Sequence, residues 1–238
     1  MRLVIFGANG PTGRLATARA LDQGHDVVAV TRRPEEFPLG GPGLTVARAD
    51  VRDAATVEPL LNDADVVVST LGVSFTREAV DTYSVGVANI VAAMKAAGAR
   101  RLVVVSSTAT YPTRRRNSPF ALRLVEPIIS RTIGKTVYDD MRRMETLVRE
   151  CGLQWTVVRP SGLFDLPAAT DYIRGEVDPV GAFTARIDLA DYLVSLAAGT
   201  TSVHRAVIVS TTENAPSLWQ MIRAEASSNE HRDALSRR

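Results

Sequence analysis

MRLVIFGANGPTGRLATARALDQG, residues 1–24, is the stretch that decides the fold of this chain. A short apolar run, residues 3–6, leads into a glycine-rich turn, and a helical pattern follows that ends at Gly24. Strand, glycine turn and helix in this order indicate a dinucleotide-phosphate site, because the first N–H groups of the helix and its positive dipole end face an anion. The alternative is a structural strand–helix turn that binds nothing.

Each glycine of the turn has a mechanical role in such a site. Gly7 lets the chain turn sharply off the strand, and Gly10 removes the Cβ that would block a pyrophosphate. Gly13 lets the helix pack closely on the strand, and Pro11 suits the first helical position, where its missing N–H costs nothing. The spacing is G-x-x-G-x-x-G, which differs from the commonest fingerprint, G-x-G-x-x-G.

Composition bounds the class of protein. The 238 residues predict one NAD(P)-binding domain over 1–226, with 161–204 contributing a small substrate lobe and 227–238 forming a polar, mobile tail. A net charge of +2 does not favour nucleic acid, and the one cysteine, Cys151, excludes an internal disulfide. No signal peptide precedes the first strand, and no apolar run reaches the ~20 residues of a membrane span. We therefore expect a cytoplasmic chain without nucleic-acid or membrane partners, either monomer or dimer.

Strand and helix patterns alternate along the rest of the chain. This alternation predicts an α/β fold, a doubly wound Rossmann-type parallel sheet in the order 3-2-1-4-5-6 with a seventh strand. The later strands are expected at 26–31, 44–48, 64–70, 101–106, 154–159 and 206–210. The later helices are expected at 54–62, capped by Asp53, at 79–98, at 136–150, at 189–198, capped by Asp188, and at 216–226.

The end of the second strand predicts which dinucleotide is bound. An Asp or Glu at this place typically bonds the ribose 2′-hydroxyl of NAD, but here the chain reads Thr31-Arg32-Arg33-Pro34. Two guanidiniums can pair with a 2′-phosphate through charge-assisted bonds, which predicts NADP(H) over NAD(H). The alternative is that both arginines are solvated loop residues. Further on, Asp50 is a candidate acceptor for an adenine amino group.

A basic segment, 112–135, is the least regular part of the chain. It carries six cations against one acid, and it suggests either a lid that attracts an anionic substrate or a solvated loop beside a short helix. Its cations are Arg114, Arg115, Arg116, Arg123, Arg131 and Lys135. Four aromatic residues are candidates for a stacking wall, namely Phe75, Tyr111, Phe120 and Phe164. The three histidines, His25, His204 and His231, show no metal-ligand spacing, so we predict no metal.

The motifs together resemble the atypical short-chain dehydrogenase/reductases. The segments that carry the resemblance are GANGPTGR (7–14), the paired arginines, VVSTLG (67–72), LVVVSST (102–108) and LQWTVVRPSGLFD (153–165). The nearest branch is the NmrA-like and flavin-reductase or biliverdin-IXβ-reductase-like NAD(P)H-binding proteins. The resemblance covers the chain to about residue 212 and is more specific for fold and cofactor than for the reaction.

Carried over residue by residue, the resemblance implies a cofactor site and an active-site hydroxyl. It implies Gly7, Gly10 and Gly13 as the glycine turn, with Asn9, Thr12 and Gly13 at the pyrophosphate. It implies Arg32 at the 2′-phosphate and Asp50 and Val51 at the adenine. At the other end of the cofactor, it implies Thr70, Leu71 and Gly72 beside the nicotinamide ribose, Pro160 and Gly162 at the nicotinamide, and Thr108 as the active-site hydroxyl.

The superfamily's Tyr-x-x-x-Lys pair is altered. Tyr138 and Arg142 occupy its place, and a guanidinium differs in shape from the ammonium that normally assists the tyrosine. Tyr138 is either an acid/base or a plain helix residue, and Arg142 alternatively forms an i,i+3 pair with Glu145. Several reductases of the nearest branch need no such tyrosine, because solvent supplies the proton.

The leading hypothesis is an NADPH-dependent oxidoreductase that transfers hydride to a small conjugated or carbonyl substrate, such as a flavin or quinone. The alternative is a non-catalytic, NADP(H)-binding redox-sensing regulator of the NmrA-like type. A nucleotide-sugar epimerase or dehydratase is disfavoured, because the lobe after Pro160 is short and the lysine is missing.

Overall fold

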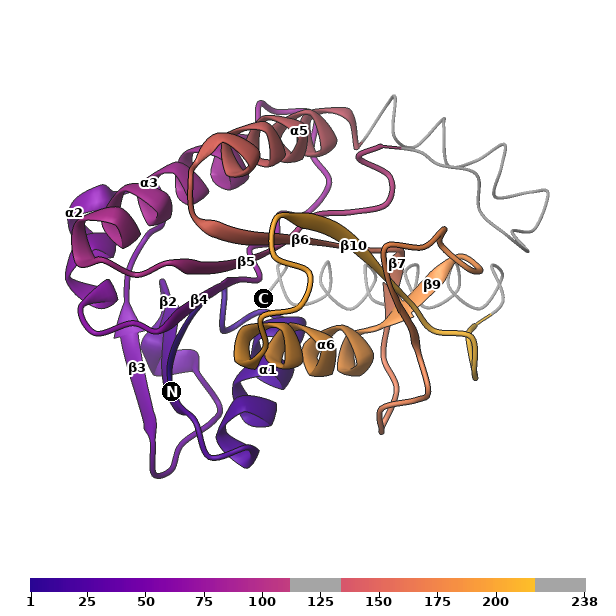
Figure 1. The fold of residues 1–238 in the computed structure, drawn as a ribbon, viewed down its shortest axis with the longest axis horizontal. Helices are drawn as coiled ribbons and strands as arrows, with labels where there is room; N and C mark the ends of the chain where they lie inside the picture. The colour runs from indigo at the N-terminus through magenta and orange to yellow at the C-terminus, as the bar shows by residue number, and fades with distance from the viewer. Residues whose placement is uncertain (112–133, 217–238) are drawn as a thin grey trace, which may run out of the picture.

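The structure is a computed structural model that describes residues 1–111 and 134–216. Its centre is an eight-stranded sheet with the order β3-β2-β1-β4-β5-β6-β10-β8 (Figure 1). All neighbours pair in parallel except β8, which is antiparallel to β10. The strands are β1 (Arg2–Phe6), β2 (Asp26–Thr31), β3 (Leu44–Arg48), β4 (Val66–Ser69), β5 (Arg101–Val105), β6 (Gln154–Pro160), β8 (Ile173–Gly175) and β10 (Arg205–Ser210). The predicted order and seventh strand are confirmed, and β8 is an additional edge strand.

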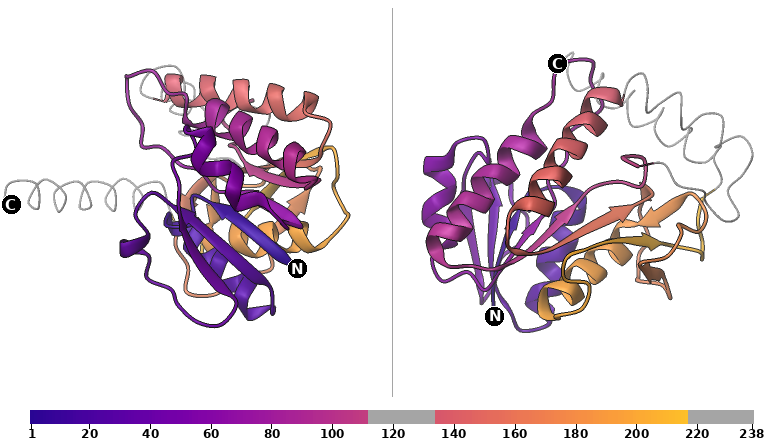
Figure 2. Two further views of the ribbon diagram at one scale, coloured as in Figure 1. Left: turned by 90° about the vertical axis from the view of Figure 1, so that its left-hand side faces the viewer. Right: turned by 45° about the horizontal axis from the view of Figure 1, so that its top comes forward.

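Helices cover both faces of this sheet (Figures 1 and 2). One face carries α1 (Pro11–Asp22) and α6 (Arg186–Ala198). The other carries α2 (Ala54–Val57), the 3-10 turn η2 (Glu58–Leu61), α3 (Thr82–Ala97) and α5 (Lys135–Glu150). The alternation of side chains along β1 explains both layers, since Leu3 and Ile5 join the first core and Val4 and Phe6 join the second.

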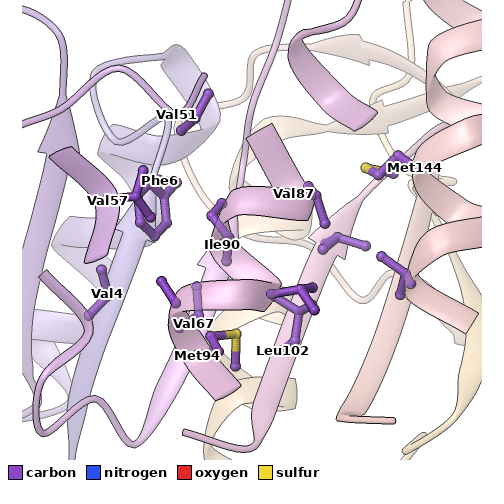
Figure 3. Close-up of a cluster of buried hydrophobic side chains, with 14 of the residues drawn as sticks. Val4, Phe6, Val51, Val57, Val67, Val87, Ile90, Met94, Leu102 and Met144 are labelled. Atoms are coloured by element: carbon purple, nitrogen blue, oxygen red, sulfur yellow. The ribbon is translucent and has the colours of Figure 1, made fainter. Parts of the chain in front are cut away.

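One apolar face of α3 packs into the core of the protein (Figure 3). Val87, Ile90, Val91 and Met94 are spaced i, i+3, i+4, i+7, which places them on one face of the helix, and all four are buried. They pack in one apolar cluster with strand residues such as Leu102. Each such side chain contributes about 1.5–3 kcal/mol on burial, and Leu71 and Val73 pack against the same cluster, so this face anchors the loop that follows β4.

Helix α2 is shorter than the sequence predicts, and α3 begins at Thr82 and not at residue 79. Asp53 caps α2 as predicted, accepting from the Ala55 N–H at 3.1 Å. The helix ends at Val57 and continues as a 3-10 turn, because Pro59 has no N–H to donate to an i−4 carbonyl.

The predicted cap of α6 is wrong. The helix begins at Arg186, directly after the short strand β9 (Phe183–Ala185), so Asp188 lies within its first turn. The fully buried carboxylate of Asp188 accepts from the N–H and hydroxyl of Thr170, both at 2.8 Å, and from the Thr211 hydroxyl at 2.5 Å. Asp188 therefore connects the segment before β8 to the chain just after β10.

Residues between β6 and α6 form a second small sheet. The strand β7 (Gly162–Phe164) pairs in parallel with β9. Phe164 meets Phe183 edge-on at 6.2 Å between ring centroids, and both rings are buried. A 3-10 turn, η1 (Pro34–Glu36), follows β2. The predicted helix 216–226, beyond its first residue, and the predicted tail 227–238 lie outside the described residues.

Candidate cofactor site and active site

The predicted site residues gather at one edge of the sheet because the strands that carry them are parallel. The glycine turn follows β1, the paired arginines follow β2, and Thr70 follows β4. Thr108 follows β5, and Pro160 ends β6. The carboxyl ends of neighbouring parallel strands form the crevice in which doubly wound folds bind their ligands.

The glycine turn is packed as tightly as its residue types predict. Gly7 has φ +76°, and a Cβ there would lie 2.7 Å from the Thr70 carbonyl oxygen. A Cβ on Gly13 would lie 2.3 Å from the Gly7 carbonyl oxygen, so α1 rests directly on the turn. Gly10 has one near neighbour, the same carbonyl oxygen, 3.3 Å from the place of a Cβ. The predicted sharp turn at Gly7 and close packing at Gly13 are confirmed.

The first turn of α1 is suited to an anion. Gly10 is its N-cap, Pro11 is its first residue as predicted, and no side chain caps it. The first turn holds no acidic residue, so the N–H groups of Thr12 and Gly13 and the helix dipole face no negative side chain of that turn. This arrangement fits the phosphates of a dinucleotide.

Arg14 brings a positive charge to the same turn. Its Nε and Nη2 donate to the Asn9 side-chain oxygen at 3.0 and 2.8 Å, and its Nε also donates to the Asn9 carbonyl at 3.0 Å. Sequence reasoning passed over Arg14, although the arginine directly follows the last glycine of the motif. Its guanidinium orders Asn9, one of the predicted pyrophosphate residues.

The paired arginines after β2 differ in their surroundings. Arg33 forms an exposed ion pair with Glu36 at 3.0 Å. Within residues 1–111 and 134–216, Arg32 forms no ion pair, and its carbonyl accepts from Nη1 of Arg48 at 2.8 Å. Arg48 also pairs with Glu35 at 2.7 Å, which fixes the backbone on which Arg32 sits.

The chain after β3 presents an ionised carboxylate. The backbone N–H and the guanidinium of Arg52 hold the pKa of Asp50 below its ordinary value. Val51 is buried, and its carbonyl accepts from the Asn89 side chain at 2.8 Å. A Cβ on Gly86 would lie 2.8 Å from a Val51 methyl, so α3 approaches this segment closely.

The loop after β4 is held to β1 and to α3. The backbone N–H and the hydroxyl of Thr70 both donate to the Phe6 carbonyl at 2.9 Å. The Val73 N–H donates to the Tyr83 hydroxyl at 3.1 Å. Leu71 packs against the α3 core, and a Cβ on Gly72 would meet nothing within 4 Å. Space is therefore open at Gly72, where the sequence predicts a cofactor contact.

The ends of β5 and β6 are joined through their backbones. The Ser106 N–H donates to the Val158 carbonyl at 2.8 Å, and the Thr108 N–H donates to the Pro160 carbonyl at 2.9 Å. Thr108 itself is buried. A Cβ on Gly162 would lie 3.1 Å from the Phe183 ring, which makes glycine the residue that fits there.

Helix α5 places the altered pair. Tyr138 is half-buried, and its ring lies 5.9 Å from the ring of Phe75, which is exposed. The Arg142 Nε donates to the Thr110 carbonyl at 2.9 Å, and its Nη1 pairs with Asp139 at 2.5 Å. The alternative prediction, an i,i+3 ion pair between Arg142 and Glu145, is wrong. The Arg142 guanidinium instead pairs with Asp139, three residues before it in the helix.

The described candidates for an aromatic wall, Phe75, Tyr111 and Phe164, each have different ring or cation partners. Phe75 packs against Tyr138, and Tyr111 lies 4.6 Å from the guanidinium of Arg159. Phe164 is buried in the small sheet, so its ring presents no open stacking face. Phe120 and the possible lid, apart from residues 134 and 135, lie outside the described residues.

Within residues 1–111 and 134–216, no group of three or more His, Cys, Asp or Glu side chains is placed to hold a metal ion. No helix in the same part of the chain combines the length and apolarity that crossing a bilayer requires. Cys151 is a free, buried cysteine at the end of α5.

A family model described as NAD(P)H-binding matches residues 7–200, which include the glycine turn, both arginines and the ends of β4, β5 and β6. The chain belongs to this NAD(P)H-binding family. This confirms the predicted class of cofactor, a nicotinamide dinucleotide, and the predicted membership of an NAD(P)H-binding family.

Two relatives extend the comparison. An uncharacterised protein of Mycobacterium tuberculosis is 31% identical over 165 residues, which are 69% of this chain and 15% of that protein. A (4-alkanoyl-5-oxo-2,5-dihydrofuran-3-yl)methyl phosphate reductase of Streptomyces griseus is 30% identical over 158 residues, 66% of this chain and 46% of that protein. The chain thus matches less than half the length of either relative.

Solved structures show the same fold. A short-chain dehydrogenase/reductase of Veillonella parvula in complex with NADP has a TM-score of 0.72 at 19% identity, covering 89% of this chain and 95% of that one. At this identity the likeness supports the Rossmann-type architecture and not a shared reaction.

Proposed function

We propose that this protein is an NADPH-dependent reductase that transfers hydride to a small conjugated or carbonyl acceptor, such as a flavin or a quinone. The observation that carries the proposal is the uncapped start of α1 on the glycine turn, beside a second strand that ends in arginine. A nicotinamide dinucleotide, when bound, supplies the hydride, and the protein supplies orientation and exclusion of water.

The phosphate end of the cofactor is assigned to the first turn of α1 and the end of β2. Asn9, Thr12 and Gly13 take the pyrophosphate, because helix N–H groups face this position and the first turn of α1 holds no acidic residue. Arg32 takes the 2′-phosphate, and Arg33 takes a lesser part because Glu36 already engages its guanidinium. This assignment is the reason for preferring NADP(H) over NAD(H).

The remaining cofactor contacts follow the strand ends. Asp50 accepts from the adenine amino group, for which its low pKa suits it, and Val51 lies beside it. The ribose of the nicotinamide is assigned to the open space at Gly72, with its neighbours Thr70 and Leu71. The nicotinamide itself is assigned to Pro160 and Gly162, and residues 161–204 to the substrate lobe.

The reacting oxygen of a carbonyl substrate is assigned to the hydroxyls of Thr108 and Tyr138. Tyr138 supplies the proton, and Arg142 holds a fixed positive charge one helical turn away. A flavin or quinone takes its proton from solvent, so these acceptors do not need Tyr138. The Streptomyces griseus relative supports the substrate class, since its name describes a reductase of an unsaturated oxo-furan phosphate.

Turnover with a panel of acceptors tests the proposal. The full chain is mixed with NADPH or NADH and with quinones, flavins or α,β-unsaturated carbonyl compounds, and loss of the reduced nicotinamide absorbance is followed. Oxidation above the protein-free rate, faster with NADPH than with NADH, is expected. Tight binding of NADPH without any oxidation would overturn the reductase and favour the NADP(H)-binding regulator.

A further inference from the structure

A stripe of three polar side chains runs along α5 on the side of the proposed active site. Tyr138, Arg142 and Glu145 are spaced i, i+4, i+7, which places them on one face of the helix. Arg142 holds the Thr110 carbonyl at 2.9 Å, and Glu145 accepts from the Ser106 hydroxyl at 2.7 Å. The stripe therefore meets both ends of the loop 106–110 that carries the candidate hydroxyl.

Glu145 is the most deeply enclosed member of the stripe. It is fully buried, yet each of its two carboxylate oxygens accepts two hydrogen bonds. Arg159 of β6 donates to it through Nε at 3.0 Å and through Nη2, and Arg149 donates at 3.2 Å. Burying a charge is costly without such partners, so this carboxylate is a fixed element of the fold.

The loop that Glu145 reaches is pinned from two directions. The Ser106 hydroxyl lies 3.2 Å from the Thr110 hydroxyl, which links the carboxylate to the far end of the loop. On the other side, the Thr108 N–H is bonded to the Pro160 carbonyl at 2.9 Å. Since Arg159 directly precedes Pro160, one carboxylate connects the loop after β5 with the end of β6.

We propose that Glu145 is a positioning residue of the active site, acting through Ser106 to hold the loop 106–110 and with it the hydroxyl of Thr108. The catalytic consequence rests on the proposed reductase function, whereas the ordering of the loop does not. Glu145 makes no contact with substrate or cofactor in this account. Its effect is on the geometry in which hydride and proton transfer take place, which is sensitive to small displacements.

The chain contains a matched control on the same helix. Asp140 is also fully buried on α5, and it accepts from a serine hydroxyl, that of Ser84, and from the N–H groups of Tyr83 and Ser84. This carboxylate stabilises the start of α3 and does not touch the loop 106–110. Ser106→Ala and Ser84→Ala thus remove the same kind of bond, a serine hydroxyl on a buried carboxylate, from two different places.

The two serine variants are compared by hydrogen–deuterium exchange, by the emission of bound NADPH and by steady-state kinetics with an acceptor from the panel. For Ser106→Ala we expect amide exchange in 106–110 to rise about ten-fold, the emission of bound NADPH to shift, and kcat to fall about ten-fold with the KM for NADPH within about two-fold. Ser84→Ala should leave all of these unchanged.

Equal exchange and equal kcat in the two variants would overturn the proposal. Glu145→Gln should reproduce the Ser106→Ala pattern with a lower unfolding temperature, because the amide offers a donor where Arg159 needs an acceptor. If Glu145→Gln does not fold, Ser106→Ala decides alone. If the wild type oxidises no NADPH, the reductase function fails by itself, and exchange and emission still decide the role of Glu145.

Discussion

Arg32→Ala is the substitution that tests the cofactor preference most sharply. Arg32 is exposed and forms no ion pair with the described residues, so its side chain supports little of the fold. Its carbonyl is held by Arg48, which remains in the variant. We therefore expect a change in stability within about 0.5 kcal/mol, which keeps any loss of binding attributable to the missing guanidinium.

The magnitude follows from the bonds that a 2′-phosphate would lose. Hydrogen bonds to charged groups contribute about 1–3 kcal/mol, which corresponds to an increase of about 5- to 150-fold in the Kd for NADPH. The Kd for NADH should change by less than about two-fold, since NADH has no phosphate there. Arg33→Ala is the matched control, and we expect a smaller loss, because the Arg33 guanidinium is already paired with Glu36 at 3.0 Å.

Calorimetric or fluorescence titration of each variant with NADPH and NADH, at low and at raised salt, makes the measurement. The difference between the cofactors should shrink with salt, because exposed charge pairs are screened. Equal losses for NADPH and NADH would refute the assignment of Arg32 to the 2′-phosphate. A larger loss in Arg33→Ala would move that assignment to its neighbour.

Three further predictions concern packing, proton transfer and alkaline stability. Gly13→Ala places a methyl 2.3 Å from the Gly7 carbonyl oxygen, so it should lower the free energy of unfolding by about 1–3 kcal/mol. Gly72→Ala places its methyl in open space and should leave the unfolding temperature unchanged. Similar unfolding temperatures for the two variants would contradict the packing of α1. Tyr138→Phe should lower turnover of carbonyl substrates but leave quinone and flavin turnover within about two-fold, and an intact carbonyl rate would exclude Tyr138 as the proton donor. Burial raises the pKa of Tyr83 to about 12. The unfolded chain ionises this tyrosine near pH 10, so its contribution is complete below about pH 10 and is lost as the pH rises towards 12. Denaturant unfolding across that interval should show a smaller loss in Tyr83→Phe, and an identical slope would count against the burial of this hydroxyl.

Much of the fold could be predicted because its strands are buried on both faces. The run Asp26–Thr31 carries the β-branched residues that such a strand needs, and the structure places it with the expected limits and buries all but its first residue. The run Leu44–Arg48 also has the expected limits, although it is an edge strand with no fully buried residue. The edge strand Ile173–Gly175 was missed because three residues with one arginine and one glycine show no period. Similarly, the start of α6 was missed because an acid at position 188 resembles a cap, although its carboxylate bonds residues far along the chain.

The glycine turn of the site was readable from the sequence because each glycine is required by local geometry. Glu145 was noticed only as a neighbour of Arg142, yet a signal was present. It falls at i+4 from Met141 and i−3 from Val148, inside the buried stripe of the helix. An acid at a core position implies buried partners. The sequence does not identify these partners, because Ser106 lies 39 residues away and meets Glu145 only once the sheet has formed.

Hydride transfer itself is tested most directly in a single turnover of the full chain. The protein is mixed anaerobically with NADPH that carries deuterium at either the 4R or the 4S position of the nicotinamide, together with the best acceptor of the panel. The account predicts slower oxidation with one of the two labels only, because a fixed nicotinamide presents one hydrogen to the acceptor. No oxidation above the protein-free rate would contradict a reductase, and equal rates with both labels and with unlabelled NADPH would contradict hydride transfer from a fixed nicotinamide as the step that limits the turnover.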